Sequence, residues 1–396
     1  SLSNVFEFLS YPIITQDFNL VYNINLRGEM RTKQIILERR SLMEENLEKE
    51  LLDKIRLVSP GTKLRKALDE IMDAQLGALI VFINEDEFKA NLNVFQSGFK
   101  IDSPFSPEKL YELSKMDGAI IIDEGITKII AANIHLVPDP YIPTLETGTR
   151  HRTAERIAKQ FNKMVIAISK RRNVVTLYYK DQKHAFEDIN FILTRVSQTI
   201  NTLEKFRETF DKDLELLSFR EIDTNVTLDF VCEILARGVE IKNISNDVLV
   251  NIVELGNEGR LSSLRLREVL KDLNDVMTLM IMDYSKKDLS EEEARTVLES
   301  MWGLEHKLIF FARALGYEIS NLHQVMETLV APRGYRILRR EVHIPVAVSQ
   351  NLVKSFHTIG NLAKTDINHL EKVDGIGTKR AKTILHTLKN IKKKRG

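Results

Sequence analysis

A histidine flanked by two arginines stands where a helix is expected to begin. The stretch TGTRHRTAERIAKQ, residues 147–160, contains Arg150, His151 and Arg152, and its later apolar residues recur at the spacing of one helical face. Cations are unfavourable at a helix N-terminus, because that end already carries partial positive charge. The pattern therefore predicts that an anion binds among these three side chains.

Two threonines of the same stretch are candidates for the N-cap of this helix. Thr149 and Thr153 each carry a hydroxyl that can accept a hydrogen bond from a first-turn N–H group. The alternative is a charged helix end that simply faces water, and taken alone His151 is more often incidental than catalytic. This stretch therefore indicates a binding site only if another motif in the sequence supplies complementary groups.

An aspartate followed by a glycine supplies the candidate carboxylate. In SKMDGAIIIDE, Asp117 precedes Gly118, Ala119 and an apolar run that predicts a buried strand. A carboxylate at a strand edge, beside a residue without a side chain, suits a hard metal ion next to a phosphate. Because Asp-Gly is also a common turn pair, a plain turn is the alternative.

A third polar cluster, SKRRN at residues 169–173, follows another apolar run. Taken alone, Ser169, Arg171 and Arg172 fit a solvated hairpin turn. Together the three clusters offer one carboxylate, several cations and hydroxyls, which can hold a metal ion and a triphosphate. The sequence contains no G-x-x-x-x-G-K-[ST], strand-linked G-x-G-x-x-G, H-E-x-x-H or G-x-S-x-G motif, so a different kind of phosphate site is required.

The elements that must position these clusters alternate between helix and strand patterns. Apolar runs at 77–83, 118–123, 128–137, 164–169 and 174–180 predict strands of a largely buried mixed sheet, and we assign residues 44–190 to this α/β domain. No proline occurs between Thr144 and Ala331, and helical spacing dominates residues 191–330, which predicts an all-helical middle domain. Residues 331–396 form a third domain. The expected fold class is therefore multidomain, α/β plus all-α.

Residues 1–43 are an N-terminal extension outside these domains. Residues 1–29 lack the basic start and apolar run of a signal peptide, and both Met30 and Met43 precede normal charged helical patterns. The residues before Met30, Arg27 to Glu29, can be encoded by a purine-rich stretch like a ribosome-binding site. Our hypothesis is that residues 1–29 are not native protein.

The carboxyl-terminal 27 residues are strongly basic in a chain of net charge +1. Nine Lys or Arg stand against two acids there, which indicates a polyanionic partner. LEKVDGIGTKRAKTIL, residues 370–385, resembles a helix-hairpin-helix motif, with a tight turn at Gly375 and Gly377. The predicted DNA contacts, which are independent of base sequence, are Gly375, Gly377, Thr378, Lys379, Arg380 and Lys382. An αα-hairpin with a solvated tail is the alternative.

Composition limits the remaining possibilities. Hydrophobic residues make up 43% of the chain and charged residues 29%, as in ordinary globular proteins. The single cysteine, Cys232, excludes a disulfide framework and fits the cytoplasm. No apolar stretch approaches the length of a membrane span, so we expect no membrane partner.

The paired motifs DGA at 117–119 and GTRHRT at 148–153 resemble those of the diadenylate cyclase family. With the helical middle domain and the C-terminal hairpin, residues 44–396 resemble its DNA-integrity-scanning members. This resemblance implies condensation of two ATP into cyclic di-AMP and two pyrophosphates, with Mg²⁺ or Mn²⁺ as cofactor. It implies that Asp117 binds the metal ion and helps to activate the ribose 3′-hydroxyl, with Arg150, His151 and Arg152 as further catalytic residues. The nucleotide-binding residues that it implies are Gly118, Ala119, Leu136, Thr149, Arg150, His151, Arg152, Thr153, Ser169, Arg171 and Arg172.

The implied assembly and partners follow from the product and from the family. Cyclic di-AMP is two-fold symmetric, so two ATP molecules held face to face across a dimer satisfy the chemistry, and the residues themselves argue only for an even-numbered assembly. The resemblance implies an octamer that is nucleoid-associated in the cytoplasm and senses branched DNA such as Holliday junctions. A non-catalytic DNA-binding scaffold is one alternative. A structure-specific nuclease is another alternative. It would need several clustered carboxylates, for which Asp123 and Glu124 are the nearest candidates.

Overall fold

The computed structural model describes residues 49–393 in two compact units. One unit contains residues 49–58 and 71–184, and the other contains residues 59–70 and 185–393. The predicted extension at 1–43, with the hypothesis about residues 1–29, lies outside the described residues. The predicted domain boundaries stay predictions.

The first unit is built on an eight-stranded mixed sheet, as the apolar runs predicted. The strand order is β2-β5-β4-β1-β6-β7-β8, with β3 paired to β5. β1 and β4 are parallel, and the other pairs with a defined register are antiparallel. The strands are β1 (Ala78–Phe82), β2 (Phe95–Gln96), β3 (Phe99–Pro104), β4 (Ala119–Ile122), β5 (Lys128–Leu136), β6 (Met164–Ser169), β7 (Val174–Tyr179) and β8 (Gln182–Ala185).

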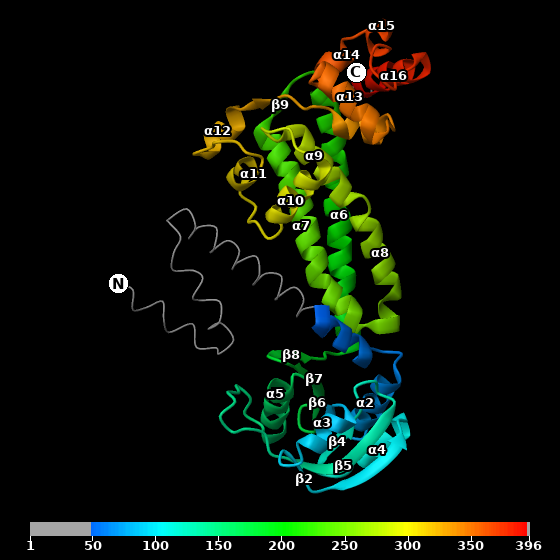
Figure 1. The fold of residues 1–396 in the computed structure, drawn as a ribbon, viewed down its shortest axis with the longest axis vertical. Helices are drawn as coiled ribbons and strands as arrows, with labels where there is room; N and C mark the ends of the chain where they lie inside the picture. The colour runs from blue at the N-terminus through cyan, green and yellow to red at the C-terminus, as the bar shows by residue number, and fades with distance from the viewer. Residues whose placement is uncertain (1–48, 394–396) are drawn as a thin grey trace, which may run out of the picture. The chain divides into compact units, whose positions relative to one another are not determined.

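Short helices flank this sheet, and α5 matters most for function (Figure 1). α5 (Thr149–Phe161) packs against β6 and β7 and buries Ala154, Ile157 and Ala158 in the same core as Val165 and Ala167. Because these apolar residues recur at helical spacing, the N-terminus of α5 is fixed relative to the strand ends. Further helices here are α3 (Glu85–Ala90) and α4 (Pro107–Leu113), and residues 49–58 are helical as well. α2 (Lys63–Asp73) spans the boundary between the two units.

The second unit is entirely helical apart from one two-stranded ribbon, as far as the described residues go. Its long helices α6 (Ile189–Ile222), α7 (Leu228–Glu254) and α8 (Arg260–Leu270) run alongside one another (Figure 1). Helical spacing continues through residues 264–284, but Asp272 adopts a left-handed φ of 57° and separates α8 from α9 (Leu273–Tyr284). α10 (Glu291–Met301), α11 (Leu308–Ala314) and α12 (Leu322–Glu327) follow, and β9 (Val226–Thr227) pairs with β10 (Leu329–Val330).

The C-terminal helices complete the second unit. They are α13 (Val346–Phe356), α14 (Ile359–Ala363), α15 (Ile367–Leu370) and α16 (Thr378–Lys393). Their apolar side chains join those of α6 and α7 in one continuous core, which includes Leu370, Ile384 and Leu388. Within the described part of the chain, no helix is both long and apolar enough to span a membrane.

Candidate functional site

A pocket of about 310 Å³ in the first unit brings two of the three predicted polar clusters together. One side comes from the segment that enters β4, one from the end of β5, and one from the first turn of α5. All of its lining residues except Leu79, Ile134 and His135 are predicted site residues. The full lining is Leu79, Asp117, Gly118, Ala119, Ile134, His135, Leu136, Thr149, Arg150 and Thr153.

Asp117 has the properties expected of a metal ligand that acts together with a substrate. Its side chain is exposed, and no hydrogen bond or ion pair within residues 49–393 engages its carboxylate. The described residues contain no cluster of three or more His, Cys, Asp or Glu that could enclose a metal ion. Mg²⁺ is commonly held by one or two carboxylates, with water and substrate phosphates completing its shell. The donor set therefore fits Mg²⁺ or Mn²⁺ delivered with a nucleotide.

Gly118 is required by packing within the sheet. A Cβ atom on Gly118 would lie 2.4 Å from the backbone carbonyl carbon of Asn133 in β5, which no real contact allows. The Gly118 N–H also donates to Oδ1 of Asn133 at 3.1 Å. Asn133 itself has a left-handed φ of 56°, at a register irregularity between β4 and β5. The glycine thus lets β4 and β5 approach each other beside Asp117, a role that the sequence did not reveal.

The N-terminus of α5 faces the pocket without a side-chain cap. Gly148 is the N-cap residue, so the expectation that Thr149 or Thr153 caps the helix was wrong, and both threonines line the pocket instead. The first intrahelical bond runs from Arg152 N–H to Gly148 O at 2.9 Å, which leaves the preceding three N–H groups without a helical acceptor. This uncapped helix end and the Arg150 guanidinium favour an anion.

His151 is not among the pocket's lining residues, and a buried tyrosine holds it. Its Nδ1 lies 2.9 Å from the hydroxyl of Tyr178 in β7, and that hydroxyl donates to Oε1 of Glu146 at 2.9 Å. Burial is the main cause that lowers the pKa of His151, and Lys183, Arg150 and Arg172 lower it further, whereas Glu146 opposes them. His151 is therefore neutral near pH 7, and only Arg150 and Arg152 bring full positive charge to this turn of helix.

The remaining predicted residues lie outside the pocket lining. Arg152 donates to the carbonyl of Thr147 at 3.2 Å and so supports the segment before α5. The hydroxyl of Ser169 accepts a bond from the Arg172 N–H at 3.2 Å, which orders the turn between β6 and β7. Arg171 and Arg172 are exposed, and Arg172 is near enough to His151 to affect its pKa.

Sequence reasoning missed several residues that build the site. His135 lines the pocket on the strand that carries Leu136, and its position directly before Leu136 was the available signal. Tyr178 and Glu146 gave no signal, because an apolar strand and a polar loop conceal their contact with His151. Tyr178 lies 27 residues from its partner, so only the packing of α5 on β7 brings them together.

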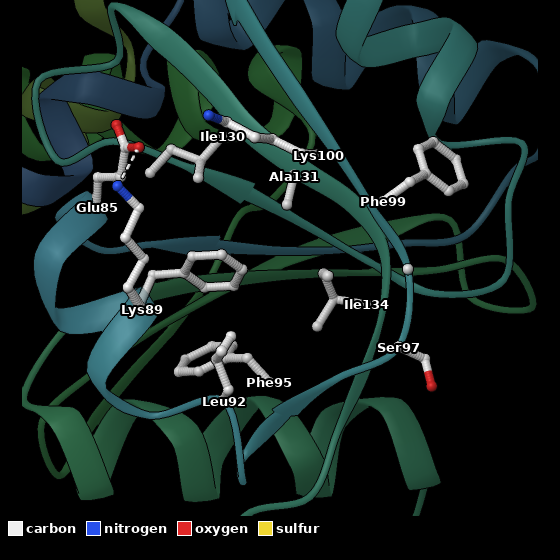
Figure 2. Close-up of a pocket in the computed structure, with 12 residues that line it drawn as sticks. Glu85, Lys89, Leu92, Phe95, Ser97, Phe99, Lys100, Ile130, Ala131 and Ile134 are labelled. Atoms are coloured by element: carbon white, nitrogen blue, oxygen red, sulfur yellow. Dashed lines mark ion pairs between the residues drawn. The ribbon is translucent and has the colours of Figure 1, made fainter.

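A second pocket of about 210 Å³ in this unit is apolar and has a different character. Figure 2 shows Phe95, Leu92 and Ile134 around it, with an ion pair between Glu85 and Lys89 at its rim. It contains none of the predicted site residues and shares only Ile134 with the first pocket. The polar pocket is thus the candidate active site.

The predicted hairpin in the second unit lies between α15 and α16. Gly375 has a left-handed φ of 85°, and a Cβ there would meet Val348 at 2.8 Å. Gly377 has ordinary backbone geometry, and no atom lies within 4 Å of the position its Cβ would take. The first glycine therefore forms the turn, and the second leaves the backbone open beside the N-terminus of α16.

The predicted DNA-contacting residues surround this open backbone. Thr378, Lys379 and Lys382 are exposed, as are Gly375, Gly377 and Arg380. Arg380 also donates to the carbonyl of Gly375 at 2.6 Å, so part of its role is to hold the turn. On the opposite side Val373, Ile376 and Ala381 are buried. The hairpin has the apolar and basic sides that the sequence predicted.

Comparisons with known proteins agree with this arrangement. Three family models match successive segments: "DisA bacterial checkpoint controller nucleotide-binding" at residues 65–183, "DisA bacterial checkpoint controller linker region" at 186–324, and "Helix-hairpin-helix motif" at 343–395.

Whole-chain relatives give the same result. The DNA integrity scanning protein DisA of Thermotoga neapolitana is 48% identical over 87% of this chain and 98% of its own length. Its counterpart in Thermotoga maritima is 48% identical over 87% of this chain and 96% of its own, and that of Carboxydothermus hydrogenoformans is 43% identical over 85% and 96%. The chain therefore belongs to the family of the DNA integrity scanning protein DisA, in which a diadenylate cyclase domain is followed by a helical linker and a helix-hairpin-helix region.

Proposed function

We propose that this diadenylate cyclase condenses two ATP molecules into cyclic di-AMP and two pyrophosphates in the pocket beside the N-terminus of α5. The observation that carries the proposal is the meeting of Asp117 with Thr149, Arg150 and Thr153 in one pocket. A free carboxylate and an uncapped, basic helix end are complementary to a metal ion and to the phosphates that accompany it.

The residues divide the work of nucleotidyl transfer. Leu136, Ala119 and Gly118 accommodate the adenosine, while Thr149, Arg150 and Thr153 hold phosphate oxygens. Arg150, Arg152, Arg171 and Arg172 stabilise negative charge that develops on the α-phosphate and the departing pyrophosphate. His151 and Ser169 complete the phosphate contacts. Positioning and charge stabilisation are the main demands of this reaction, because the protein contributes little covalent chemistry.

Asp117 is the proposed ligand of Mg²⁺ or Mn²⁺, and His135 is the other side chain of a ligating type in the pocket. When bound, the ion supplies Lewis-acid activation of the ribose 3′-hydroxyl and neutralises phosphate charge. The chain's own part is to place Asp117 at the start of β4, where the close approach of Gly118 to Asn133 fixes the backbone.

The finer partners and assembly are also proposals. Each nucleotide must be both attacker and target, so we infer that two copies face each other across an isologous dimer. We infer further that such dimers form an octamer, that the protein works in the cytoplasm at the nucleoid, and that branched DNA such as a Holliday junction binds the hairpin at Gly377 and Lys379 and regulates cyclisation.

Incubation of the full chain with ATP and Mg²⁺ or Mn²⁺, with products resolved by chromatography, tests this function. The expected products are cyclic di-AMP and pyrophosphate, in a yield that changes when a four-way junction is added. ATP left unchanged would instead indicate a non-catalytic scaffold, and cleavage of the junction would indicate a nuclease.

A further inference from the structure

The side chains around His151 form a continuous hydrogen-bonded chain that the proposed phosphate contacts do not explain. Lys183 in β8 lies 2.5 Å from Oε1 of Glu146, which accepts from the Tyr178 hydroxyl. That hydroxyl in turn lies 2.9 Å from Nδ1 of His151. Tyr178 is fully buried, so its hydroxyl has been withdrawn from water to make these two contacts.

The direction of these bonds follows from the donors available. Glu146 is ionised, because the hydrogen bonds from Lys183 and Tyr178 outweigh its burial and lower its pKa. An ionised carboxylate can only accept, so the single Tyr178 proton points to Glu146. The Tyr178 oxygen must then accept from His151, which places the proton of the neutral ring on Nδ1. Nε2 is left with a lone pair.

This tautomer has a consequence for a polyanionic substrate. A lone pair on Nε2 repels a phosphate oxygen, whereas a protonated Nε2 donates to it and adds a positive charge. A phosphate that approaches Nε2 therefore favours transfer of one proton from solvent to that nitrogen, with no other bond made or broken. The Nδ1–H bond to Tyr178, backed by the Glu146 charge, stabilises the resulting imidazolium.

We propose that Tyr178 and Glu146 are positioning residues of the cyclase reaction, which hold His151 protonated on Nδ1 so that Nε2 meets the polyphosphate and takes up a proton as it binds. The inference rests on the proposed function and deepens it. Neither residue needs to touch ATP, since both act through His151. The charges that face the ring are Glu146 from the loop before α5, Arg150 from α5, Arg172 from the β6–β7 turn and Lys183 from β8.

The sign of the expected pH effect can be stated. Because the protonated ring is the productive form, kcat/KM falls as pH rises through the pKa of His151. Removing the Tyr178 hydroxyl or the Glu146 charge disfavours the imidazolium and lowers that pKa. In Tyr178→Phe and Glu146→Gln the falling limb should therefore move to lower pH. A move of about one pH unit makes kcat/KM about tenfold lower at any pH above the limb.

Tyr179→Phe is the matched control. Tyr179 is the next residue of β7, and its hydroxyl also donates to a carboxylate, Glu50, at 2.9 Å. Tyr179→Phe removes a tyrosine hydroxyl from the same strand as Tyr178→Phe does, but this hydroxyl does not contact His151. The pH profile of kcat/KM should therefore stay as in the wild type. Melting temperature and elution volume check that each variant is folded, and Glu146→Gln provides a second route if Tyr178→Phe unfolds.

The experiment measures kcat/KM for ATP with Mg²⁺ across about pH 4.5–8, which spans both sides of the limb, in wild type and these variants, alone and combined with His151→Gln. We name the hydrogen-bonded chain Glu146–Tyr178–His151 the relay. We expect the falling limb at lower pH in Tyr178→Phe and in Glu146→Gln, and almost no further loss of kcat/KM when Tyr178→Phe is added to His151→Gln. A loss of equal size below and above the limb, which leaves the limb at its wild-type pH, or losses that multiply in the double variant, would overturn the proposal.

A wild-type enzyme that makes no cyclic di-AMP would refute the proposed function and leave the relay open to a second test. Selective ¹⁵N-histidine labelling reports the tautomer of His151 directly, with His151→Gln identifying its signal. A proton on Nδ1 in wild type, lost as the dominant form in Tyr178→Phe, supports the relay. A proton on Nε2 in wild type contradicts it.

Discussion

Two polar clusters of this molecule, one in each unit, use charged side chains in opposite ways. In the second unit Arg336 donates to Glu221 at 2.7 Å and to Ser218 at 3.0 Å, and Tyr284 donates to the same glutamate at 2.5 Å. The neighbouring Asp283 accepts three backbone N–H groups, from residues 334–336, at 2.6–2.9 Å. Glu221, Asp283 and Arg336 are at most 2% exposed. We name these five side chains the linker cluster.

In the candidate active site of the first unit, by contrast, charged and polar groups have no partner within the described part of the fold. Asp117 is exposed and has no partner among the described residues, and the first turn of α5 has no side-chain cap. In the linker cluster Glu221 accepts from Arg336 and Tyr284, and Asp283 accepts from backbone N–H groups. The cluster therefore ties α6 and α9 to the segment that leads to α13. The comparison teaches that charged side chains paired with one another stabilise the fold, whereas charged side chains without a partner in the fold are available to bind a ligand.

Breaking the closed cluster should give the largest change in stability. Arg336→Met leaves Glu221 buried without its counter-charge, which typically costs about 3–5 kcal/mol in the free energy of unfolding. Denaturant titration of the variant beside the wild type measures this loss in the free energy of unfolding. The double variant Glu221→Gln/Arg336→Met removes both charges and should recover part of that loss. A single variant no less stable than the double variant would show that the pair is not an essential closed contact.

A substitution at Gly118 sharpens the comparison, because this glycine is a packing residue inside the open site. In Gly118→Ala the new methyl group meets the Asn133 backbone, and overpacking of this kind costs about 1–3 kcal/mol. We expect loss of cyclase activity together with reduced stability. Gly125→Ala, an exposed position where the nearest atom is a carboxylate oxygen of Asp123 at 3.2 Å, is the control for adding a methyl group. Unchanged stability in Gly118→Ala would contradict the close approach of β4 and β5.

The two hairpin glycines should also differ, one serving packing and the other ligand binding, with a smaller effect on the free energy of unfolding. Gly375→Ala places a side chain at a left-handed φ and against Val348, which we expect to cost about 1–2 kcal/mol of stability. Gly377→Ala adds a methyl group in open space, so the fold should be unaffected while affinity for a four-way junction falls. Thermal unfolding and a salt-dependent binding titration of both variants distinguish the roles. Equal stability losses would show that Gly377 also serves packing.

The sequence predicted the elements that bury continuous apolar runs. Strands β1, β4, β5, β6 and β7 were found because their buried residues are consecutive. β3 was missed, since its FKIDSP sequence has no buried residue, and α3 was missed because it has six residues and none is buried. The end of α8 was also hidden, because a left-handed aspartate leaves the helical spacing of its neighbours intact.

The site was predictable where motif and chemistry coincide and not where distant elements meet. Asp117, Arg150 and the threonines could be proposed from residue type alone. The grouping of Gly118 with Asn133 depends on strand register, and that of His151 with Tyr178 depends on helix packing. Neither leaves a local pattern in the sequence, so both required the structure.

Asp117→Asn tests the central claim most directly, because it removes the open carboxylate and changes nothing that the fold contacts. Cyclic di-AMP formed from ATP and metal ion, measured beside the wild type and beside binding of a four-way junction, is the readout. The account predicts that the product disappears while junction binding and melting temperature stay at wild-type values. Full cyclase activity in this variant would remove Asp117 from the mechanism and contradict the account.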